Sequence, residues 1–133
     1  MKKRVLYIDD NPNNRLFVKR ILQAEGHEML EAVDGESGWS TVIREMPDFI
    51  FVDLLMPGMD GFELTRKIKS SPQLSHIPVV TLTAYGNSET EQIAKESGSD
   101  GFLHKPANTG QIQTVLRQFL NTGASTSTTL VGR

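Results

Sequence analysis

Short apolar runs alternate with amphipathic stretches through most of this chain, and that alternation limits the fold more than any other feature. Runs of this length with little polar alternation are typical of strands buried on both faces, as in a parallel sheet covered by helices. Alternating strands and helices joined by right-handed crossovers form a doubly wound α/β domain of three layers. The five runs are Val5–Ile8, Glu28–Ala32, Phe49–Val52, Pro78–Leu82 and Gly101–Leu103.

Capping residues and apolar spacing predict five helices. Asn11 caps the first helix, Pro12 fits its first turn and Gly26 suits its end. The second helix covers Glu36–Met46 and stops at Pro47. The third helix follows Asp60-Gly61, and Asn108 caps the fifth. The residues expected to face inward are Phe17, Val18, Ile21 and Leu22 in the first helix, Trp39, Val42, Ile43 and Met46 in the second, Leu64 and Ile68 in the third, and Ile112, Val115, Leu116, Phe119 and Leu120 in the fifth.

The fourth amphipathic stretch, Ser88–Ser97, has only Ile93 and Ala94 on its apolar side. Its start, Ser88-Glu89-Thr90-Glu91, has the form of a capping box. A helix with so narrow an apolar stripe gains little from burial, so we expect it to be loosely held. A well-solvated helix at the edge of the sheet is the simpler interpretation when the segment is considered alone.

The composition excludes several classes of function. The chain has 133 residues, a net charge of −2 and no basic stripe, which argues against direct nucleic-acid binding. No apolar run is long enough to span a bilayer, and the absence of cysteine makes a cytoplasmic setting the default expectation. We expect one domain over residues 1–121, followed by a polar and disordered tail or a truncated linker over residues 122–133.

Polar residues stand at the carboxyl ends of four predicted strands. In open α/β sheets ligands bind beyond these ends, where the strand order reverses. If the order is 2-1-3-4-5, the reversal lies between the first and third strands. The residues brought together there are Asp9, Asp10, Asp53, Thr83 and Lys105.

Three carboxylates in one cleft repel one another. At an effective dielectric constant of about 20 and a separation of roughly 5 Å, each pair costs about 3 kcal/mol. Lys105 supplies one positive charge, and a divalent cation with oxygen ligands would supply the rest. Magnesium suits such a site, with manganese as an alternative. Each of the five residues taken alone fits a purely structural role, such as a helix cap or a surface lysine. Such roles do not require all five residues at one edge of the sheet. The three histidines, His27, His76 and His104, are expected to face solvent.

Five sequence motifs contain the predicted site residues or follow the third strand. They are Val5-Leu6-Tyr7-Ile8-Asp9-Asp10, Pro47-Asp48-Phe49-Ile50-Phe51-Val52-Asp53, Met56-Pro57-Gly58-Met59-Asp60-Gly61, Ile77-Pro78-Val79-Val80-Thr81-Leu82-Thr83-Ala84 and Gly101-Phe102-Leu103-His104-Lys105-Pro106. Through these motifs the chain resembles the response-regulator receiver domain of the chemotaxis-regulator superfamily, over about residues 4–121. The resemblance implies a flavodoxin-like fold, with a five-stranded parallel sheet in the order 2-1-3-4-5 and helices on both faces.

The resemblance also implies a role for each site residue. Asp53 would accept a phosphoryl group from the phosphohistidine of a sensor histidine kinase or a histidine phosphotransfer protein. Asp10, Asp53 and the backbone carbonyl of Leu55 would bind magnesium directly, and Asp9 would act through a water. Thr83 and Lys105 would contact the phosphoryl oxygens, Phe102 would turn inward on activation, and Pro106 would follow a cis peptide bond that aims Lys105 into the cleft.

Two positions that vary in this family are occupied by Leu55 and Tyr85. Neither side chain offers a carboxylate or an amide to orient a water for attack on an aspartyl phosphate, so we expect slow hydrolysis.

The sequence therefore predicts a stand-alone response regulator that signals by binding a downstream protein, with a homodimer left open. It is not expected to be an enzyme beyond its own phosphorylation and slow dephosphorylation. A magnesium-dependent phosphatase is the alternative enzyme class, but such enzymes need a second aspartate where Leu55 stands. A receiver-like scaffold that is never phosphorylated and a transcription factor without its DNA-binding half are further alternatives. The sequence does not distinguish a role in phosphate relay from direct binding to a target protein.

Overall fold

The computed structural model describes residues 2–54, 58–84 and 87–120, and these form alternating strands and helices. The strands are β1 (Arg4–Ile8), β2 (Glu28–Ala32), β3 (Phe49–Asp53), β4 (Val79–Thr83) and β5 (Gly101–His104). The helices are α1 (Pro12–Ala24), α2 (Gly35–Glu45), α3 (Gly61–Ser70), α4 (Ser88–Glu96) and α5 (Thr109–Leu120). Each predicted strand is present, with bounds within one residue at each end of those expected from the sequence.

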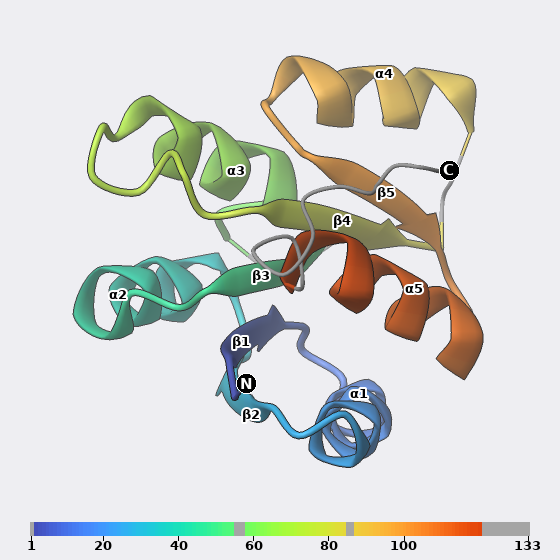
Figure 1. Ribbon diagram of the computed structural model, residues 1–133. Coiled ribbons are helices and arrows are strands. Elements are labelled where there is room, and N and C mark those ends of the chain that lie inside the picture. The colour runs from blue at the N-terminus through green and yellow to red at the C-terminus, as the bar shows by residue number, and fades with distance from the viewer. Residues whose placement is uncertain (1, 55–57, 85–86, 121–133) are drawn as a thin grey trace.

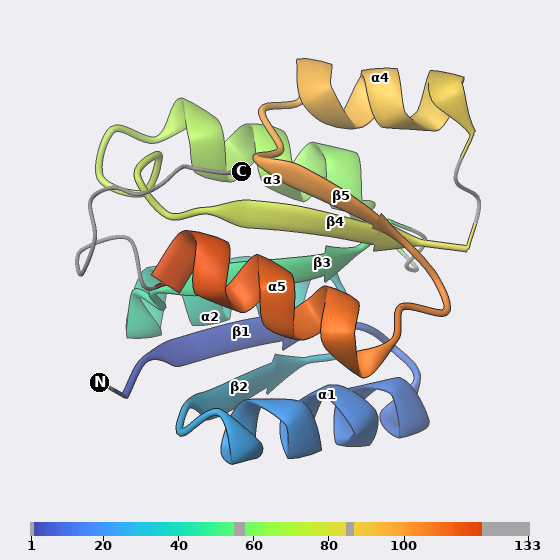
Figure 2. The same ribbon diagram turned by 45° about the vertical axis from the view of Figure 1, so that its right-hand side comes forward.

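The five strands form one parallel sheet in the order β2-β1-β3-β4-β5, as predicted. In Figure 2, α1 and α5 lie in front of the sheet, while α2 and α3 lie behind it; α4 lies beside β5 in both ribbon views. Alternate residues of each central strand point to opposite faces, so the sheet separates two apolar cores. Tyr7, Phe49 and Phe51 belong to the core under α1 and α5, and Leu6, Ile8 and Ile50 to the core under α2 and α3.

The predicted helix caps are mostly confirmed. The Asn11 side chain accepts hydrogen bonds from the backbone N–H groups of Asn13 and Asn14, at 2.8 and 3.3 Å. Gly26 follows α1 with a φ of +84°, a left-handed conformation that glycine adopts without a Cβ clash. Asn108 and Gln111 exchange side-chain hydrogen bonds with each other's backbone N–H at the start of α5.

The prediction for the start of α4 was wrong by one residue. The cap is Asn87, whose Oδ1 accepts a hydrogen bond from Thr90 N at 2.8 Å, and Ser88 is the first helical residue. Two polar residues that can cap a helix stand side by side here, and the extended backbone of Asn87 (φ −117°, ψ 176°) directs its side chain to the exposed N–H. Only Ala94 among the apolar residues of α4 is buried, so the narrow apolar stripe is confirmed. The looseness of this helix stays a prediction.

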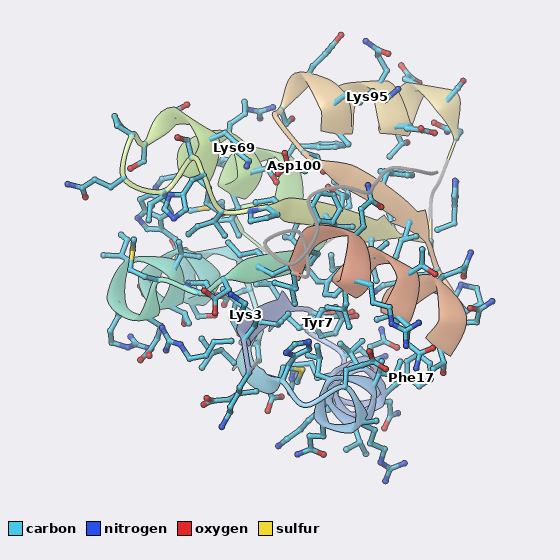
Figure 3. The ribbon with its side chains drawn as sticks, in the orientation of Figure 1. Lys3, Tyr7, Phe17, Lys69, Lys95 and Asp100 are labelled. Atoms are coloured by element: carbon cyan, nitrogen blue, oxygen red, sulfur yellow. The ribbon has the colours of Figure 1, made fainter. Side chains whose placement is uncertain are left out.

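The predicted inward faces of α1 and α2 were partly wrong. Phe17, Ile43 and Met46 are 44%, 52% and 43% exposed; Figure 3 labels Phe17 on α1. On α2 the buried side is formed by Val42, as predicted, together with Gly35, Gly38 and Thr41. A Cβ on Gly38 would lie 2.7 Å from the Ile8 side chain, so α2 approaches β1 at Gly38, while Ile43 and the following Met46 face outward.

Other packing details bear on the sequence-based expectations. Trp39 is partly buried and lies under the Lys67 ammonium, which is 4.6 Å from the ring centre. Leu64 and Ile68 face inward as predicted. His27 does not face solvent: it is half-buried, and its Nδ1 accepts a hydrogen bond from Lys3 N at 3.1 Å. Burial lowers the pKa of His27, because the charged form is harder to solvate there.

The exposure predicted for the other two histidines is confirmed, since His76 and His104 both lie on the surface.

At the far end of the sheet, Lys69 of α3 binds Asp100 at 2.8 Å and the carbonyl of Ile77 at 2.7 Å (Figure 3), which ties α3 to the segment before β5. In the described part of the chain no helix is long and apolar enough to cross a membrane.

The close approach at Gly61 provides a test of the packing. A Cβ at this position would lie 2.7 Å from the Asp53 carbonyl oxygen and 3.0 Å from Leu54 Cα, and these backbone atoms cannot move aside cheaply. We expect Gly61→Ala to lower the free energy of unfolding by about 1–3 kcal/mol. Gly110→Ala is the matched control, because its new Cβ would meet only the Asn108 side chain at 3.4 Å. Urea denaturation measures both, and equal stabilities would contradict the packing described here.

Candidate functional site

The predicted site residues come together at the carboxyl edge of the sheet. Asp9 and Asp10 follow β1, Asp53 ends β3, Thr83 ends β4 and Lys105 follows β5. Because parallel strands end at one edge, residues far apart in sequence become neighbours there. The geometry confirms the predicted meeting of these strand ends, and the chemical role of each residue is a separate question.

Asp9, Asp10 and Asp53 form an acidic cluster in which one oxygen from each carboxylate lies within 4.8 Å of the others. Asp9 is fully buried and Asp53 is 7% exposed, whereas Asp10 lies on the surface. Like charges at this separation repel one another, by about 3 kcal/mol per pair at an effective dielectric constant of 20. Three carboxylate oxygens arranged in this way fit a hard divalent cation such as Mg²⁺.

Lys105 offsets part of this repulsion. Its ammonium lies 2.7 Å from Asp9 Oδ2 and 3.4 Å from Asp53 Oδ2, so it bridges two of the three carboxylates. The peptide bond between Lys105 and Pro106 is cis, as the resemblance implied. The Lys105 side chain is 18% exposed, so its ion pairs are shielded from solvent more than a surface pair would be.

Asp9 is held by more donors than the sequence suggested. Its Oδ1 accepts a hydrogen bond from Asn11 N at 2.9 Å. Its Oδ2 accepts hydrogen bonds from the Tyr7 hydroxyl at 2.8 Å and from Asn14 Nδ2 at 3.1 Å, in addition to the Lys105 ammonium. Burial alone would raise the pKa of Asp9, but the hydrogen bonds from Lys105, Asn11 and Tyr7 outweigh it and hold this pKa below its usual range.

Tyr7, Asn14 and Arg15 were not predicted as site residues. Arg15 donates from its guanidinium to the Asp9 carbonyl oxygen at 2.7 Å and to Glu31 at 2.9 Å, which fixes the turn after β1. Tyr7 stands two residues before Asp9 on β1, and the two-residue period of a strand places both on one face. That spacing is the signal that could have identified Tyr7. Burial, and then the neighbouring Asp9 charge, raise the pKa of Tyr7, so its hydroxyl remains a donor.

Thr83 and Phe102 occupy neighbouring strands. Thr83 is fully buried at the end of β4, and its carbonyl oxygen accepts a hydrogen bond from Lys105 N at 2.8 Å. Phe102 is partly exposed on β5, and its ring contacts the His104 ring edge-on, with centroids 5.3 Å apart. The predicted metal ligand at Leu55 and the predicted effect of Tyr85 fall on positions outside the described residues, as does the tail at 122–133.

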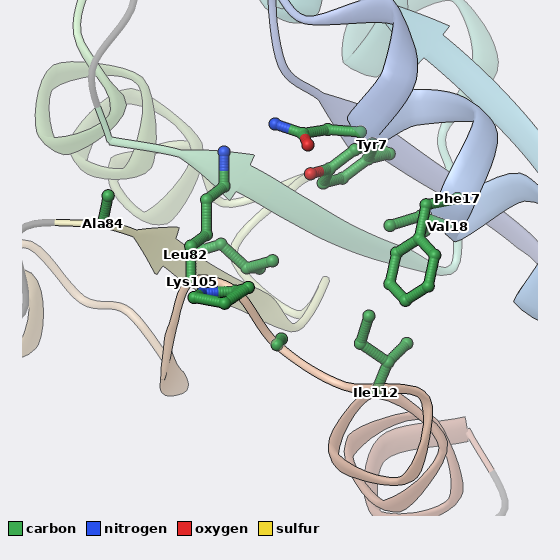
Figure 4. Close-up of a pocket in the computed structure, with 10 residues that line it drawn as sticks. Tyr7, Phe17, Val18, Leu82, Ala84, Lys105 and Ile112 are labelled. Carbon is green, nitrogen blue, oxygen red and sulfur yellow. The ribbon is translucent and has the colours of Figure 1, made fainter.

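A cavity of about 470 Å³ lies beside the acidic cluster, between α1, α5 and the ends of β4 and β5. Figure 4 shows Tyr7, Leu82 and Lys105 on one side of it and Phe17 and Ile112 on another. The lining is mostly apolar, and its polar groups gather at the end nearest the cluster. The Tyr7 ring is therefore part of the cavity wall, while its hydroxyl belongs to the site.

A family model described as the response regulator receiver domain matches residues 5–117. The chain belongs to this family. It is 41% identical over 106 residues to the response regulator PleD of Caulobacter vibrioides, covering 80% of this chain but 23% of PleD. Protein PilH of Pseudomonas aeruginosa is 33% identical over 106 residues, which are 79% of this chain and 87% of PilH. The chain thus spans about a quarter of PleD, a longer protein.

Solved structures of similar proteins agree with the fold. The chemotaxis protein CheY4 of Vibrio cholerae is 31% identical, with a TM-score of 0.84 over 90% of this chain and 100% of that chain. The Mn²⁺-bound form of the response regulator Rcp1 is 27% identical, with a TM-score of 0.80 over 90% of this chain and 96% of that chain. As a receiver domain, this chain belongs to the signalling domains of two-component systems rather than to the classical enzymes.

The balance of charge predicts the effect of removing Lys105. Lys105→Met leaves the buried Asp9 carboxylate without its ammonium, so we expect the free energy of unfolding at pH 7 to fall by about 1–3 kcal/mol. Lys19→Met is the control, because Lys19 and Glu31 form an exposed pair at 4.0 Å that contributes at most about 1 kcal/mol. Denaturant titration in metal-free buffer measures both variants.

The effect of Lys105→Met should depend on pH with a defined sign. The pKa of Asp9 is lowered in the folded state, so the stability from its ionised form is present above the ordinary aspartate pKa of about 3.9. This stability is lost as the pH falls through the folded-state pKa. The difference between wild type and Lys105→Met should therefore shrink below about pH 4. A difference that stays constant down to pH 2 would contradict the assigned contact.

Proposed function

We propose that this receiver domain is a response regulator in which Asp53 accepts a phosphoryl group from a phosphohistidine. The observation that carries the proposal is the convergence of the three carboxylates with the Lys105 ammonium, which lies 3.4 Å from Asp53 Oδ2. Phosphoryl transfer needs positioning and charge neutralisation more than covalent help from the protein. A nucleophilic oxygen beside a cation and a metal-binding cluster supplies both requirements.

In the proposed step an Asp53 carboxylate oxygen forms a bond to phosphorus while the phosphorus–nitrogen bond of the donor histidine breaks. The electron pair of that bond stays on the imidazole nitrogen. Lys105 neutralises charge on the phosphoryl oxygens, and the Thr83 hydroxyl hydrogen-bonds one of them. Asp53 needs no general base, because the attacking oxygen of a carboxylate, unlike a hydroxyl or thiol, carries no proton that must be removed.

The metal that we propose is Mg²⁺, with Mn²⁺ as an alternative. Asp10, Asp53 and the backbone carbonyl of Leu55 would bind it directly, and Asp9 would bind it through a water. When bound, the ion neutralises the cluster and the incoming phosphoryl oxygens. The acidic cluster and the Mn²⁺-bound structure of the similar protein Rcp1 support this assignment.

Phosphorylation would also provide the switch. It adds about −1.5 to −2 charge and three acceptor oxygens at Asp53. If Thr83 moves toward these oxygens, Phe102 can take the space it leaves, and the adjoining helix α4 can shift. α4 is suited to such a change, because Ala94 is its one buried apolar residue among those described.

The proposed partners are a sensor histidine kinase or histidine phosphotransfer protein as donor, and a downstream protein as target, in a cytoplasmic setting. Similarity to PilH and PleD supports a role in response regulation without identifying either partner. A homodimer is compatible with this proposal. Slow hydrolysis of the aspartyl phosphate is also part of it, because neither Leu55 nor Tyr85 carries a carboxylate or an amide that would orient water.

The acceptor can be tested directly. Incubation with Mg²⁺ and a small phosphodonor should add one phosphoryl group that is labile to hydroxylamine, and Asp53→Asn should abolish its addition. Asp48→Asn is the control, because this aspartate stands just before β3, at the opposite end of the strand from Asp53, where its side chain accepts a hydrogen bond from Arg4 N at 2.9 Å. Mass spectrometry identifies the modified residue, and a phosphoryl group on any residue other than Asp53 would refute the assignment.

The metal can be tested without phosphorylation. Mg²⁺ at ten times its dissociation constant should raise the free energy of unfolding of the wild type by about 1.4 kcal/mol. Asp10→Asn should weaken this effect, and it should also raise the stability of the metal-free protein because one repulsive charge is removed. Thermal melts with and without Mg²⁺ measure both changes. A wild-type melt unaffected by tens of millimolar Mg²⁺ would argue against the site.

A further inference from the structure

We propose that Tyr7 is a positioning residue. Its hydroxyl weakens the ion pair between Asp9 and the Lys105 ammonium, so that the ammonium can move to the phosphoryl oxygens on Asp53. This inference rests on the proposed function of Asp53 for its consequence, but the contact that it concerns can be tested without phosphorylation. Tyr7 is 1% exposed, and its hydroxyl lies 2.8 Å from Asp9 Oδ2. In Figure 4 its hydroxyl is turned to the side where the Lys105 amine lies.

The packing of the Tyr7 ring does not explain the hydroxyl. The ring contacts Phe51 edge-on, with centroids 6.2 Å apart, in a core whose other aromatic residues are phenylalanines. Phenylalanine would fill this position equally well. A buried hydroxyl costs free energy unless it is hydrogen-bonded, and the carboxylate of Asp9 is the partner that satisfies it.

Three donors share one oxygen of Asp9. Tyr7, Asn14 and Lys105 all contact Oδ2, at 2.8, 3.1 and 2.7 Å. A carboxylate offers about four acceptor sites over its two oxygens, so three donors on one oxygen compete. Tyr7 is fixed by the core and Asn14 by helix α1, whereas the Lys105 ammonium has a second carboxylate at 3.4 Å. Lys105 is therefore the donor that can leave.

The competition matters when charge arrives at Asp53. All three hydrogen bonds to the Asp9 carboxylate are charge-assisted, but in the bond from the Lys105 ammonium both partners are ionised, so Asp9 alone would hold Lys105 firmly. The hydrogen bonds from the neutral donors Tyr7 and Asn14 partly satisfy the buried Asp9 carboxylate. Less free energy is therefore lost when the Lys105 ammonium moves toward phosphoryl oxygens. Without the Tyr7 hydroxyl, Asp9 has one donor fewer, so its ion pair with Lys105 contributes more and costs more free energy to break.

A double-mutant cycle tests this competition in metal-free protein. Lys105→Met should shift the urea midpoint further in the Tyr7→Phe background than in the wild type, because Lys105 is then the stronger of the remaining donors. Phe51→Leu is the matched control, since it alters the packing of the same ring but leaves the hydroxyl in place. In that background the shift should equal the wild-type shift. An equal or smaller shift in the Tyr7→Phe background would refute the proposal.

The same variant has a kinetic consequence. At saturating Mg²⁺ and small phosphodonor, Tyr7→Phe should be phosphorylated about tenfold more slowly, which corresponds to about 1.4 kcal/mol in the barrier. Its Mg²⁺ affinity, measured by calorimetry, should be unchanged or tighter, because Asp9 is less neutralised. A merely structural defect would weaken Mg²⁺ binding together with the rate, and that result, or an unchanged rate, would overturn the positioning role. If the wild type itself accepted no phosphoryl group, the proposed function would fail, while the unfolding cycle would still decide the Tyr7 contact.

Discussion

Repulsion among Asp9, Asp10 and Asp53 is the constraint around which the carboxyl edge of the sheet is organised. Two strand ends place the three carboxylates: the end of β1 places Asp9 and Asp10, and the end of β3 places Asp53. The fold could relieve the repulsion by turning these side chains to solvent, yet Asp9 and Asp53 are buried. The chain instead places an ammonium between two of them, and the same arrangement leaves room for a second positive charge.

The sheet topology makes this arrangement possible. β1 and β3 are adjacent, and the strand order reverses between them, so the helices that follow leave on opposite faces and open a crevice. β5, which directly precedes Lys105, is separated from β3 by β4, and the long lysine side chain crosses that distance. Tyr7 and Asn14 complete the surroundings of Asp9 from β1 and α1. The Asp9 carboxylate therefore accepts hydrogen bonds from β1, from α1 and from the segment after β5.

Much of the fold and most of the site could be predicted because both depend on patterns local in sequence. Buried strands have a continuous apolar signature, and polar residues directly after them must share one edge. The errors have equally specific causes. Periodicity weighs apolar residues, so it could not anticipate that α2 approaches Ile8 through Gly38 and turns Ile43 outward.

Tyr7 was overlooked and His27 was mispredicted for a different reason. Tyr7 lies inside an apolar run, where an aromatic residue suggests only core, and its hydroxyl gains meaning once Asp9 is known to lie beside it. His27 has a polar partner, Lys3 N, 24 positions away, which no local pattern reveals. In each case the deciding contact joins groups whose proximity depends on the finished fold or on the direction of a buried side chain.

The ion pair between Asp9 and Lys105 joins residues 96 positions apart, and this separation has a consequence for synthesis on the ribosome. Chains emerge from the amino terminus, at about 5–20 residues per second, so all three aspartates are exposed for several seconds before the lysine. A nascent chain that holds β1 and β3 but lacks β5 carries the full repulsion without the Lys105 ammonium. That repulsion opposes premature closure of a partial sheet. The charge balance of the site thereby favours completion of the domain over compact fragments of it.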